Sequence, residues 1–113
     1  MTQSQLNGQA TFFKNNLNSK EYRSLLNFIF SSNKKIIRRE DFENNLSENQ
    51  QSNLDDKIRL ICHGGFLERI RPDTYKRTYI TKSKRDNLKR LNNYYLDSLL
   101  IIGERNGFVY GED

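Results

Sequence analysis

One stretch of the chain, Ser52 to Ile80, limits the possible folds more than any other. Apolar residues recur near its start at spacings of four and three, at Leu54, Ile58 and Ile61. This spacing places them on one face of an α-helix. Gly64 and Gly65 then end the predicted helix, because glycine readily adopts the left-handed backbone of a helix C-terminus. We expect the helix to begin between Gln50 and Ser52.

A basic β-hairpin is predicted directly after the glycines. Residues 66–71 and 76–80 are rich in β-forming residues, and Pro72-Asp73-Thr74 between them is a turn signal. At the other end of the helix, Ser52 and Asp55 make a capping pattern. The stretch therefore predicts a capped helix, a glycine stop and a charged hairpin.

The residues before this stretch predict a core helix, a short strand and a second short helix. Ser19 is a candidate N-cap for a helix over residues 20–32. Its broad apolar face consists of Tyr22, Leu25, Leu26, Ile29 and Phe30. Residues 34–39 are expected to be extended and to pair with the hairpin through Ile36 and Ile37. Residues 40–46 predict a helix that faces Phe42 and Leu46 inward.

After the hairpin, Thr81 is expected to cap one long last helix over residues 82–102. Its second half is apolar nearly all round, and such a helix end usually buries its surplus against another chain. We therefore expect a homodimer through this helix; the alternative is that it packs on the protein's own first helix. The expected interface residues are Leu88, Leu91, Tyr95, Leu96, Leu99 and Ile102.

The length of 113 residues predicts one domain with a terminal segment at each end. Residues 1–18 form a polar arm before the core of residues 19–81. This arm is either a disordered tail or docks Phe12 and Phe13 on the domain or on a second subunit. Residues 103–113 form a tail in which 108–110 are expected to be extended. The arm and the tail are also candidate contact sites for a protein partner.

Composition indicates a basic intracellular protein. The formal net charge is +5 and the pI is near 9.4. Cys62, the single cysteine, cannot form an intrachain disulfide, which favours a reducing compartment. Residues 1–11 lack the features of a signal peptide, and the longest apolar run is far shorter than a membrane helix. We expect a cytoplasmic, nucleoid-associated protein without a membrane contact.

The predicted order of helix, strand, two helices, hairpin and long helix resembles the winged helix-turn-helix DNA-binding domains. It is most similar to small dimeric MarR-like and PadR-like regulators and to plasmid-partition proteins, over residues 19–102. The apolar pattern from Leu54 to Ile70 carries most of the resemblance. The resemblance implies sequence-specific double-stranded DNA binding as a homodimer and regulation of transcription. Two alternatives are a centromere-binding or replication-associated protein of a plasmid or phage, and a winged helix used for protein contacts.

In this family the helix before the hairpin enters the major groove with its N-terminal residues. By position, the base contacts would come from Gln50, Gln51, Ser52, Asn53 and Lys57. Amides suit this role, since glutamine and asparagine can bond adenine with two hydrogen bonds.

The adjacent Asp55 and Asp56 depart from the family pattern, because carboxylates repel phosphate. They either cap the helix and point away, or one accepts a hydrogen bond from cytosine, or the helix does not enter the groove deeply.

The hairpin and the helix start after it are strongly basic. Residues 66–90 contain nine Lys and Arg against three Asp and Glu, a net charge of +6. Such segregated charge is typical of a phosphate-binding face, and a solvated surface is the alternative. The predicted contacts are Arg69, Arg71, Lys76, Arg77, Lys82, Lys84 and Tyr75, with Arg38 and Arg39 at the start of the second helix. Tyr79 is expected to pack within the hairpin.

The sequence offers little support for enzyme chemistry. His63 and Cys62 are adjacent, and two such ligands cannot complete a zinc site. Glycine loops that bind nucleotide phosphates are also missing from the sequence. We expect neither catalysis nor a metal or cofactor.

Overall fold

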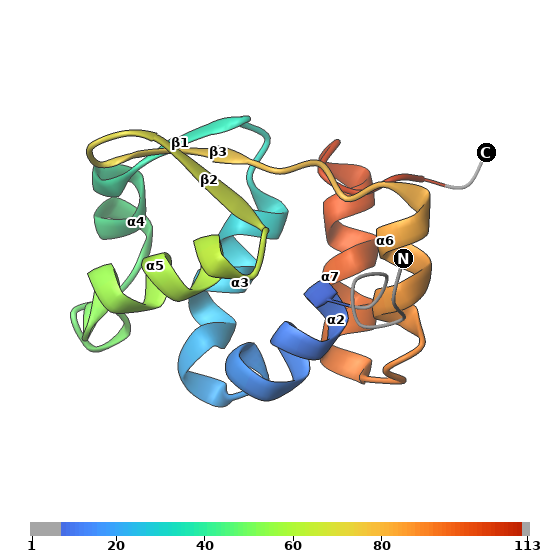
Figure 1. The fold of residues 1–113 in the computed structure, drawn as a ribbon. Coiled ribbons are helices and arrows are strands. Elements are labelled where there is room, and N and C mark those ends of the chain that lie inside the picture. The colour runs from blue at the N-terminus through green and yellow to red at the C-terminus, as the bar shows by residue number, and fades with distance from the viewer. Residues whose placement is uncertain (1–7, 112–113) are drawn as a thin grey trace.

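The computed structural model describes residues 8–111 and shows a mainly helical protein with a small antiparallel sheet (Figure 1). The first half contains α2 (Gly8–Phe12), the π-helical turn η1 (Phe13–Leu17), α3 (Lys20–Ser31), β1 (Ile36–Arg38) and α4 (Arg39–Asn45). The second half contains the 3-10 turn η2 (Asn49–Gln51), α5 (Leu54–His63), β2 (Leu67–Arg71), β3 (Thr74–Arg77), α6 (Lys82–Lys89) and α7 (Tyr94–Arg105).

The central helix α3 and the sheet confirm their predictions. The five apolar residues predicted for the face of α3 are all buried. Within the described residues the sheet has three strands in the order β1-β3-β2, with both pairs antiparallel. Ile37 pairs with Tyr75 and both are buried, whereas Ile36 faces outward and is 39% exposed. Strand β1 therefore joins the hairpin as expected, and one face of the sheet covers α3, α4 and α5.

Helix α5 begins later than the sequence predicted. It starts at Leu54, because Asn53 adopts a left-handed backbone with φ of 54° and separates the helix from η2. Asn53, rather than Ser52, occupies the N-cap position, so the predicted Ser52 cap is wrong. The C-terminal stop is confirmed. Gly65 has φ of +85°, and a Cβ on Gly64 would lie 2.9 Å from the Phe12 ring.

The single long helix predicted for residues 82–102 is wrong. Helix α6 ends at Lys89 and α7 begins at Tyr94. Asn92 is left-handed with φ of 52°, and the Asn93 side chain caps α7 by accepting from Leu96 N at 3.0 Å. Two asparagines therefore reverse the chain, and Figure 1 shows α6 and α7 side by side.

Because of this reversal, α7 packs on α3 of its own chain (Figure 1). Leu88, Leu96 and Leu99 are fully buried, and Leu91, Tyr95 and Ile102 are half-buried against the same core. The residues expected at a dimer interface are thus covered inside one chain. The apolar residues that suggested a homodimer pack against the core of their own chain, which was the alternative considered from the sequence.

The two terminal segments dock on the domain. Phe13 and Leu17 are fully buried, and the Phe13 ring lies 6.4 Å from the Phe66 ring. Docking of the arm is therefore confirmed for residues 8–18, whereas residues 1–7 lie outside the described structure. At the other end, Val109 pairs with Ile80 in a parallel bridge, as expected of an extended tail. In the described range, no helix is both long and apolar enough to cross a membrane.

Candidate nucleic-acid interface

The sheet has one open face, which we call the outer sheet face. The strand register places Arg38, Thr74 and Arg71 in one row across the three strands, and Ile36, Lys76 and Glu68 in the next row. Successive side chains of a strand alternate between faces, so these six residues share the side that turns away from the core. Their exposure agrees with this placement, since only Thr74 is partly covered.

The outer sheet face therefore presents three of the predicted phosphate contacts together, namely Arg38, Arg71 and Lys76. Its only carboxylate in these two rows is Glu68. Arg69 is also exposed, but it lies in register with Tyr75 and Ile37 on the opposite side. Arg69 thus sits at the edge of β2 near Cys62, apart from the other hairpin bases.

The start of α6 adds a second group of exposed bases. Thr81 caps the helix by accepting from Lys84 N at 3.4 Å, as predicted. The first turn contains Lys82 and Lys84, both exposed, and no acid. Positive charge is unfavourable at the N-terminus of a helix, where the helix dipole is itself positive. This violation of a local stability rule is typical of a functional surface.

Arg77, a predicted DNA contact, is a structural residue instead. It is 5% exposed and its guanidinium donates to the carbonyls of Ile29, Ser32 and Asn106. It therefore holds the C-terminal end of α3 and the end of α7. Burial lowers the pKa of Arg77 from its usual value. The prediction that this residue contacts phosphate is wrong because its side chain points into the core.

Of the two hairpin tyrosines, Tyr75 is buried and Tyr79 is exposed, the reverse of what the sequence predicted. Tyr75 is 8% exposed and lies edge-on to Phe42 at 6.4 Å, so it packs in the core and cannot reach DNA. Tyr79, expected to pack within the hairpin, is 49% exposed. The reason is the strand register, which turns Tyr75 toward α4.

The residues predicted to read bases precede α5 rather than lying on it. Gln50, Ser52 and Asn53 are exposed. Gln51 is half-buried, and its amide donates to the carbonyls of Glu43 and Leu46 at 3.1 and 2.9 Å, which satisfies the end of α4. Gln51 is therefore committed to the fold. The exposed Gln50 is also held locally, since its side-chain oxygen accepts from Ser47 N at 2.9 Å, whereas the Ser52 and Asn53 side chains face solvent.

Lys57 is 7% exposed on α5, so its predicted base contact is wrong. Arg39 is also committed to the fold. Its side chain pairs with Glu43 of α4 at 3.7 Å and with Asp55 of α5 at 3.2 Å. Asp56 pairs with Arg59 one turn further along α5. The acids of the first turn of α5 are exposed, and each has a basic partner in the same helix pair.

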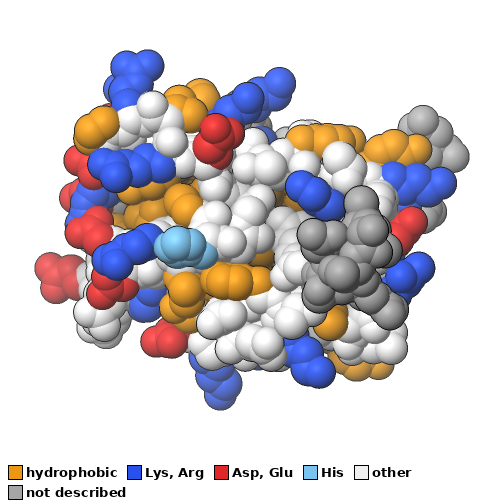
Figure 2. Space-filling model, viewed as in Figure 1, with side chains coloured by type: hydrophobic (Ala, Val, Ile, Leu, Met, Phe, Trp, Pro, Cys, Tyr) orange, Lys and Arg blue, Asp and Glu red, His pale blue; other side chains and the backbone are white. Residues whose placement is uncertain are grey.

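Charge is sharply divided between neighbouring segments. Residues 39–63, which span α4 and α5, contain six acids and three bases, a net charge of −3 with His63 neutral. Figure 2 shows most of its Asp and Glu side chains at the left edge of the view, where α4 and the start of α5 lie, with Lys and Arg side chains among them and further Lys and Arg side chains above, near the hairpin. The basic surface is therefore the sheet and α6, not the helix before the hairpin.

A groove along the outer sheet face was not predicted. Its volume is about 730 Å³, and it is lined by Ile36, Ile70 and Thr74 together with the bases Arg38, Arg39 and Arg71 and the acids Glu40, Glu43 and Asp73. Ile70 is 43% exposed at a bulge between Arg69 and Arg71. Period-two alternation could have revealed part of this face, because Ile36 and Ile37 cannot both point inward.

Cys62 and His63 lie next to each other at the C-terminal end of α5. Burial raises the pKa of the half-buried Cys62 thiol, although nearby Arg69 acts in the opposite direction, so the thiol is protonated at neutral pH. His63 is exposed at the end of α5. Among residues 8–111, no cluster of His, Cys, Asp and Glu could hold a metal ion.

Comparison of the chain with protein-family models, curated proteins and solved structures found no match.

Proposed function

We propose that this protein binds double-stranded DNA, with the outer sheet face and the start of α6 as its phosphate-binding surface. The observation that carries this proposal is the shared exposure of Arg38, Arg71 and Lys76 on one open sheet face. Lys82 and Lys84 extend the positive charge where the chain continues into α6. Lysine and arginine on one face supply the salt-dependent part of DNA affinity by releasing counterions.

The topology supports a winged helix as the fold behind this activity. Helix α3, strand β1, helices α4 and α5, and the β2-β3 hairpin occur in the order expected from the resemblance. The strand order β1-β3-β2 places the hairpin beside β1. In this proposal the hairpin is the wing, and α5 has the position of the recognition helix.

Direct base reading is a minor part of the proposed interaction. The face of α5 carries Asp55 and Asp56, and residues 39–63 are net negative, so this helix is repelled by the phosphates around a groove. Ser52 and Asn53 are exposed in the loop before it and can contact bases, whereas the Gln50 side-chain oxygen already accepts from Ser47 N at 2.9 Å. We therefore infer binding that depends mainly on the DNA backbone, with modest sequence preference.

Regulation of transcription is the cellular role that we propose from the resemblance, with plasmid or phage partition and replication as the alternatives. The proposed homodimer needs a new interface, since the residues first expected there are covered. Tyr94, 92% exposed, and Ile101, 51% exposed, lie seven positions apart on the solvent side of α7 and are the available apolar residues there. Sedimentation of the wild-type protein and a Tyr94→Ser/Ile101→Ser variant tests this interface.

The DNA proposal is tested by fluorescence anisotropy with a labelled duplex at several salt concentrations. We expect affinity to fall steeply with salt. The variant Arg38→Ala/Arg71→Ala/Lys76→Ala should bind more weakly, and its log–log salt slope should be shallower by about 0.9 for each phosphate that is no longer neutralised. The matched control Lys14→Ala/Lys20→Ala/Arg105→Ala removes three exposed charges from other elements and should keep the slope. Absence of binding by the wild type, or equal losses of affinity in both variants, would contradict the proposal.

A second function is favoured by the acidic surface of α4 and α5. The six acids of residues 39–63, five of them on these two helices and Glu48 between them, suit a basic protein partner better than DNA, and this arrangement fits a winged helix used for protein contacts. The variant Glu40→Gln/Glu43→Gln/Glu48→Gln separates the two functions. It should lose affinity for a basic partner if this surface binds protein, and keep or gain affinity for DNA if the outer sheet face binds phosphate.

A further inference from the structure

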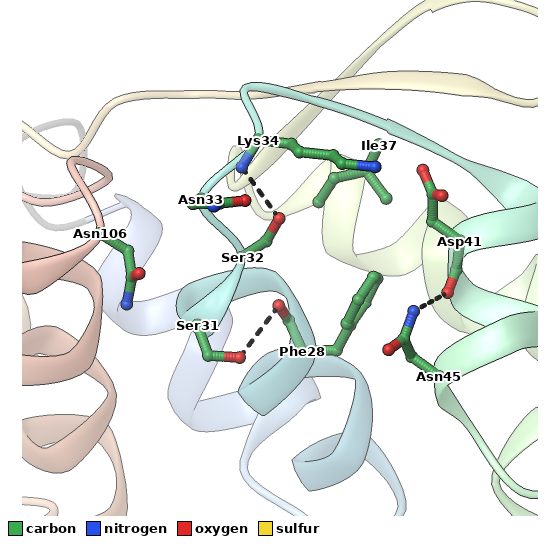
Figure 3. Close-up of a pocket in the computed structure, with 9 residues that line it drawn as sticks. All are labelled: Phe28, Ser31, Ser32, Asn33, Lys34, Ile37, Asp41, Asn45 and Asn106. Carbon is green, nitrogen blue, oxygen red and sulfur yellow. Dashed lines mark hydrogen bonds between the residues drawn. The ribbon is translucent and has the colours of Figure 1, made fainter.

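A second hollow lies on another side of the domain, away from the outer sheet face. It has a volume of about 400 Å³ and opens between the C-terminal end of α3, the loop that leads to β1, helix α4 and the end of α7. Figure 3 shows its lining side chains, which come from four separate parts of the chain. This volume is within the range of pockets that bind small molecules.

Opposite charges face one another across this pocket. Lys34 is exposed, and Figure 3 shows its side chain extended across the mouth toward Asp41 of α4. Asp41 is half-buried, and its carboxylate accepts one hydrogen bond from the residues that the structure describes, at Oδ2 from Arg38 N at 2.8 Å. Within residues 8–111, no ion pair within 4.0 Å joins Lys34 to Asp41 or to another acid. Each charge can therefore serve a ligand.

One polar group on each side of the pocket has spare hydrogen-bonding capacity. On α4, this group is the Asp41 carboxylate; Asn45 donates to the Asp41 backbone carbonyl at 2.8 Å, and Figure 3 shows the Asn45 amide below that carbonyl, away from the carboxylate. In the loop, Ser32 Oγ accepts from the Lys34 backbone N–H at 3.1 Å, and among residues 8–111 its hydroxyl donates to no other group. The α4 side thus offers an acceptor, and the loop side offers donors.

The floor between the two sides is apolar. Phe28 is half-buried, and its ring stands between the loop and α4 in Figure 3. It packs edge-on against Phe42 with ring centres 5.2 Å apart, which fixes its position. Ile37 is 1% exposed and closes the floor beneath Lys34. A small apolar group would be desolvated here without displacing a polar contact.

From this arrangement we propose that the pocket binds a free α-amino acid with an apolar side chain. The ammonium group of the ligand contacts the Asp41 carboxylate. Its carboxylate contacts the Lys34 ammonium and the Ser32 hydroxyl, and its side chain rests on Phe28. A ligand of this class satisfies both unpaired charges at once, whereas a simple anion or cation leaves one of them unmatched. The site is separate from the proposed DNA surface and does not depend on it.

The test is a two-dimensional NMR titration of the isotope-labelled wild-type protein, without DNA, with L-leucine, L-alanine and glycine in turn. We expect L-leucine to shift the amide signals of Ser32, Asn33 and Asp41. Two analogues remove one charge each: 3-methylbutylamine lacks the carboxylate, and 4-methylpentanoate lacks the ammonium group. Each should bind at least about tenfold more weakly than L-leucine, the loss expected for one charge-assisted hydrogen bond.

Matched variants locate the charges on the protein. Lys34→Gln and Asp41→Asn should each weaken L-leucine binding about tenfold or more, and Asp41→Asn retains the acceptor for Arg38 N. The neighbouring controls Lys35→Gln and Glu40→Gln, which change the same charges outside the pocket lining, should bind normally. The proposal is overturned if none of the three amino acids shifts the pocket signals, if an analogue binds as tightly as L-leucine, or if the controls lose as much affinity as the pocket variants.

Discussion

The helix pair α4–α5 and the hairpin with α6 follow one another in the chain and carry opposite charge. Residues 39–63 have a net charge of −3, and residues 66–90 have a net charge of +6. The acids of α5 pair with bases of the same helix pair, at Arg39 and Arg59. In the basic segment, seven of the nine bases are exposed, and the exceptions are Arg77 and Arg85.

This difference decides which surface the proposed DNA contact would use. Where the helix before the hairpin is acidic and the hairpin is basic, electrostatics favours contact through the sheet and α6. Within the basic segment, exposed side chains also differ from buried ones that stabilise the fold. Arg77 and Lys76 are adjacent in β3, yet Arg77 binds three backbone carbonyls at the ends of α3 and α7, and Lys76 faces outward.

The largest expected effect is the difference in stability between substitutions of Arg77 and of Lys76. Arg77→Leu should lower the free energy of unfolding by about 2–4 kcal/mol, because it leaves buried carbonyls of α3 and α7 without their donor. Lys76→Ala should change it by less than about 0.5 kcal/mol, as an exposed side chain. Urea unfolding of both variants measures the difference. Equal stability losses would show that the basic segment is not divided in this way.

The next effect concerns the start of α6. Lys82→Gln/Lys84→Gln should lower DNA affinity roughly tenfold at low salt by removing two phosphate contacts. The same change should leave the free energy of unfolding unchanged or raise it by about 0.3–1 kcal/mol, because positive charge near a helix N-terminus is unfavourable. Anisotropy and thermal unfolding on one preparation check both results. A loss of stability together with affinity would assign these lysines to the fold.

A smaller effect of opposite sign is expected on the acidic side. Asp55→Asn/Asp56→Asn should raise DNA affinity by about two- to fivefold, since phosphate repulsion falls while the hairpin contacts stay. The free energy of unfolding should fall by about 0.3–1 kcal/mol for each acid removed from the first turn of α5. If DNA affinity drops instead, α5 accepts hydrogen bonds from bases and the two regions act together.

The smallest effect lies outside both charged regions and reports on folding alone. Burial raises the pKa of Tyr95 to about 12, with Arg23 acting in the opposite direction, and its hydroxyl donates to the Arg23 carbonyl at 2.8 Å. The folded state therefore favours the protonated phenol. Its contribution to stability is complete below about pH 10, the ordinary tyrosine pKa, and is lost as the pH rises toward 12.

Tyr95→Phe should remove this part of the alkaline pH dependence and cost about 0.5 kcal/mol at neutral pH, the low end for a hydrogen bond, because this one is exposed. Unfolding curves of the wild type and the variant between pH 7 and about pH 11 measure the difference. Parallel loss of stability in both proteins above pH 10 would refute the assigned role of Tyr95.

Elements with local evidence were predictable from the sequence. Three features were predicted from a few neighbouring residues each, and all are confirmed. They are the apolar face of α3, the turn at Pro72-Asp73 and the left-handed backbone at Gly65. The break between α6 and α7 was also signalled locally. Asn92 and Asn93 are residue types that tolerate a left-handed backbone and cap helices, but the apolar run after them suggested one continuous helix.

Contacts between distant parts of the chain could not be predicted in this way. Arg77 and Lys57 are basic in a basic protein, and nothing near them in sequence shows that one binds carbonyls of residues 29, 32 and 106 and that the other is covered. The same holds for the pocket between Lys34 and Asp41, which exists only because α4 and the loop meet. For the candidate DNA surface, the sequence identified a basic segment but could not separate its exposed bases from its buried ones.

The central claim, that phosphate contacts come from the hairpin and α6 and not from α5, is tested most directly by NMR titration of the labelled protein with a short duplex. We predict the largest amide shifts at residues 70–76 and 81–85, with smaller shifts at 50–53 and little change over 55–63. Largest shifts along 54–60 of α5, with little change in the hairpin, would contradict this claim.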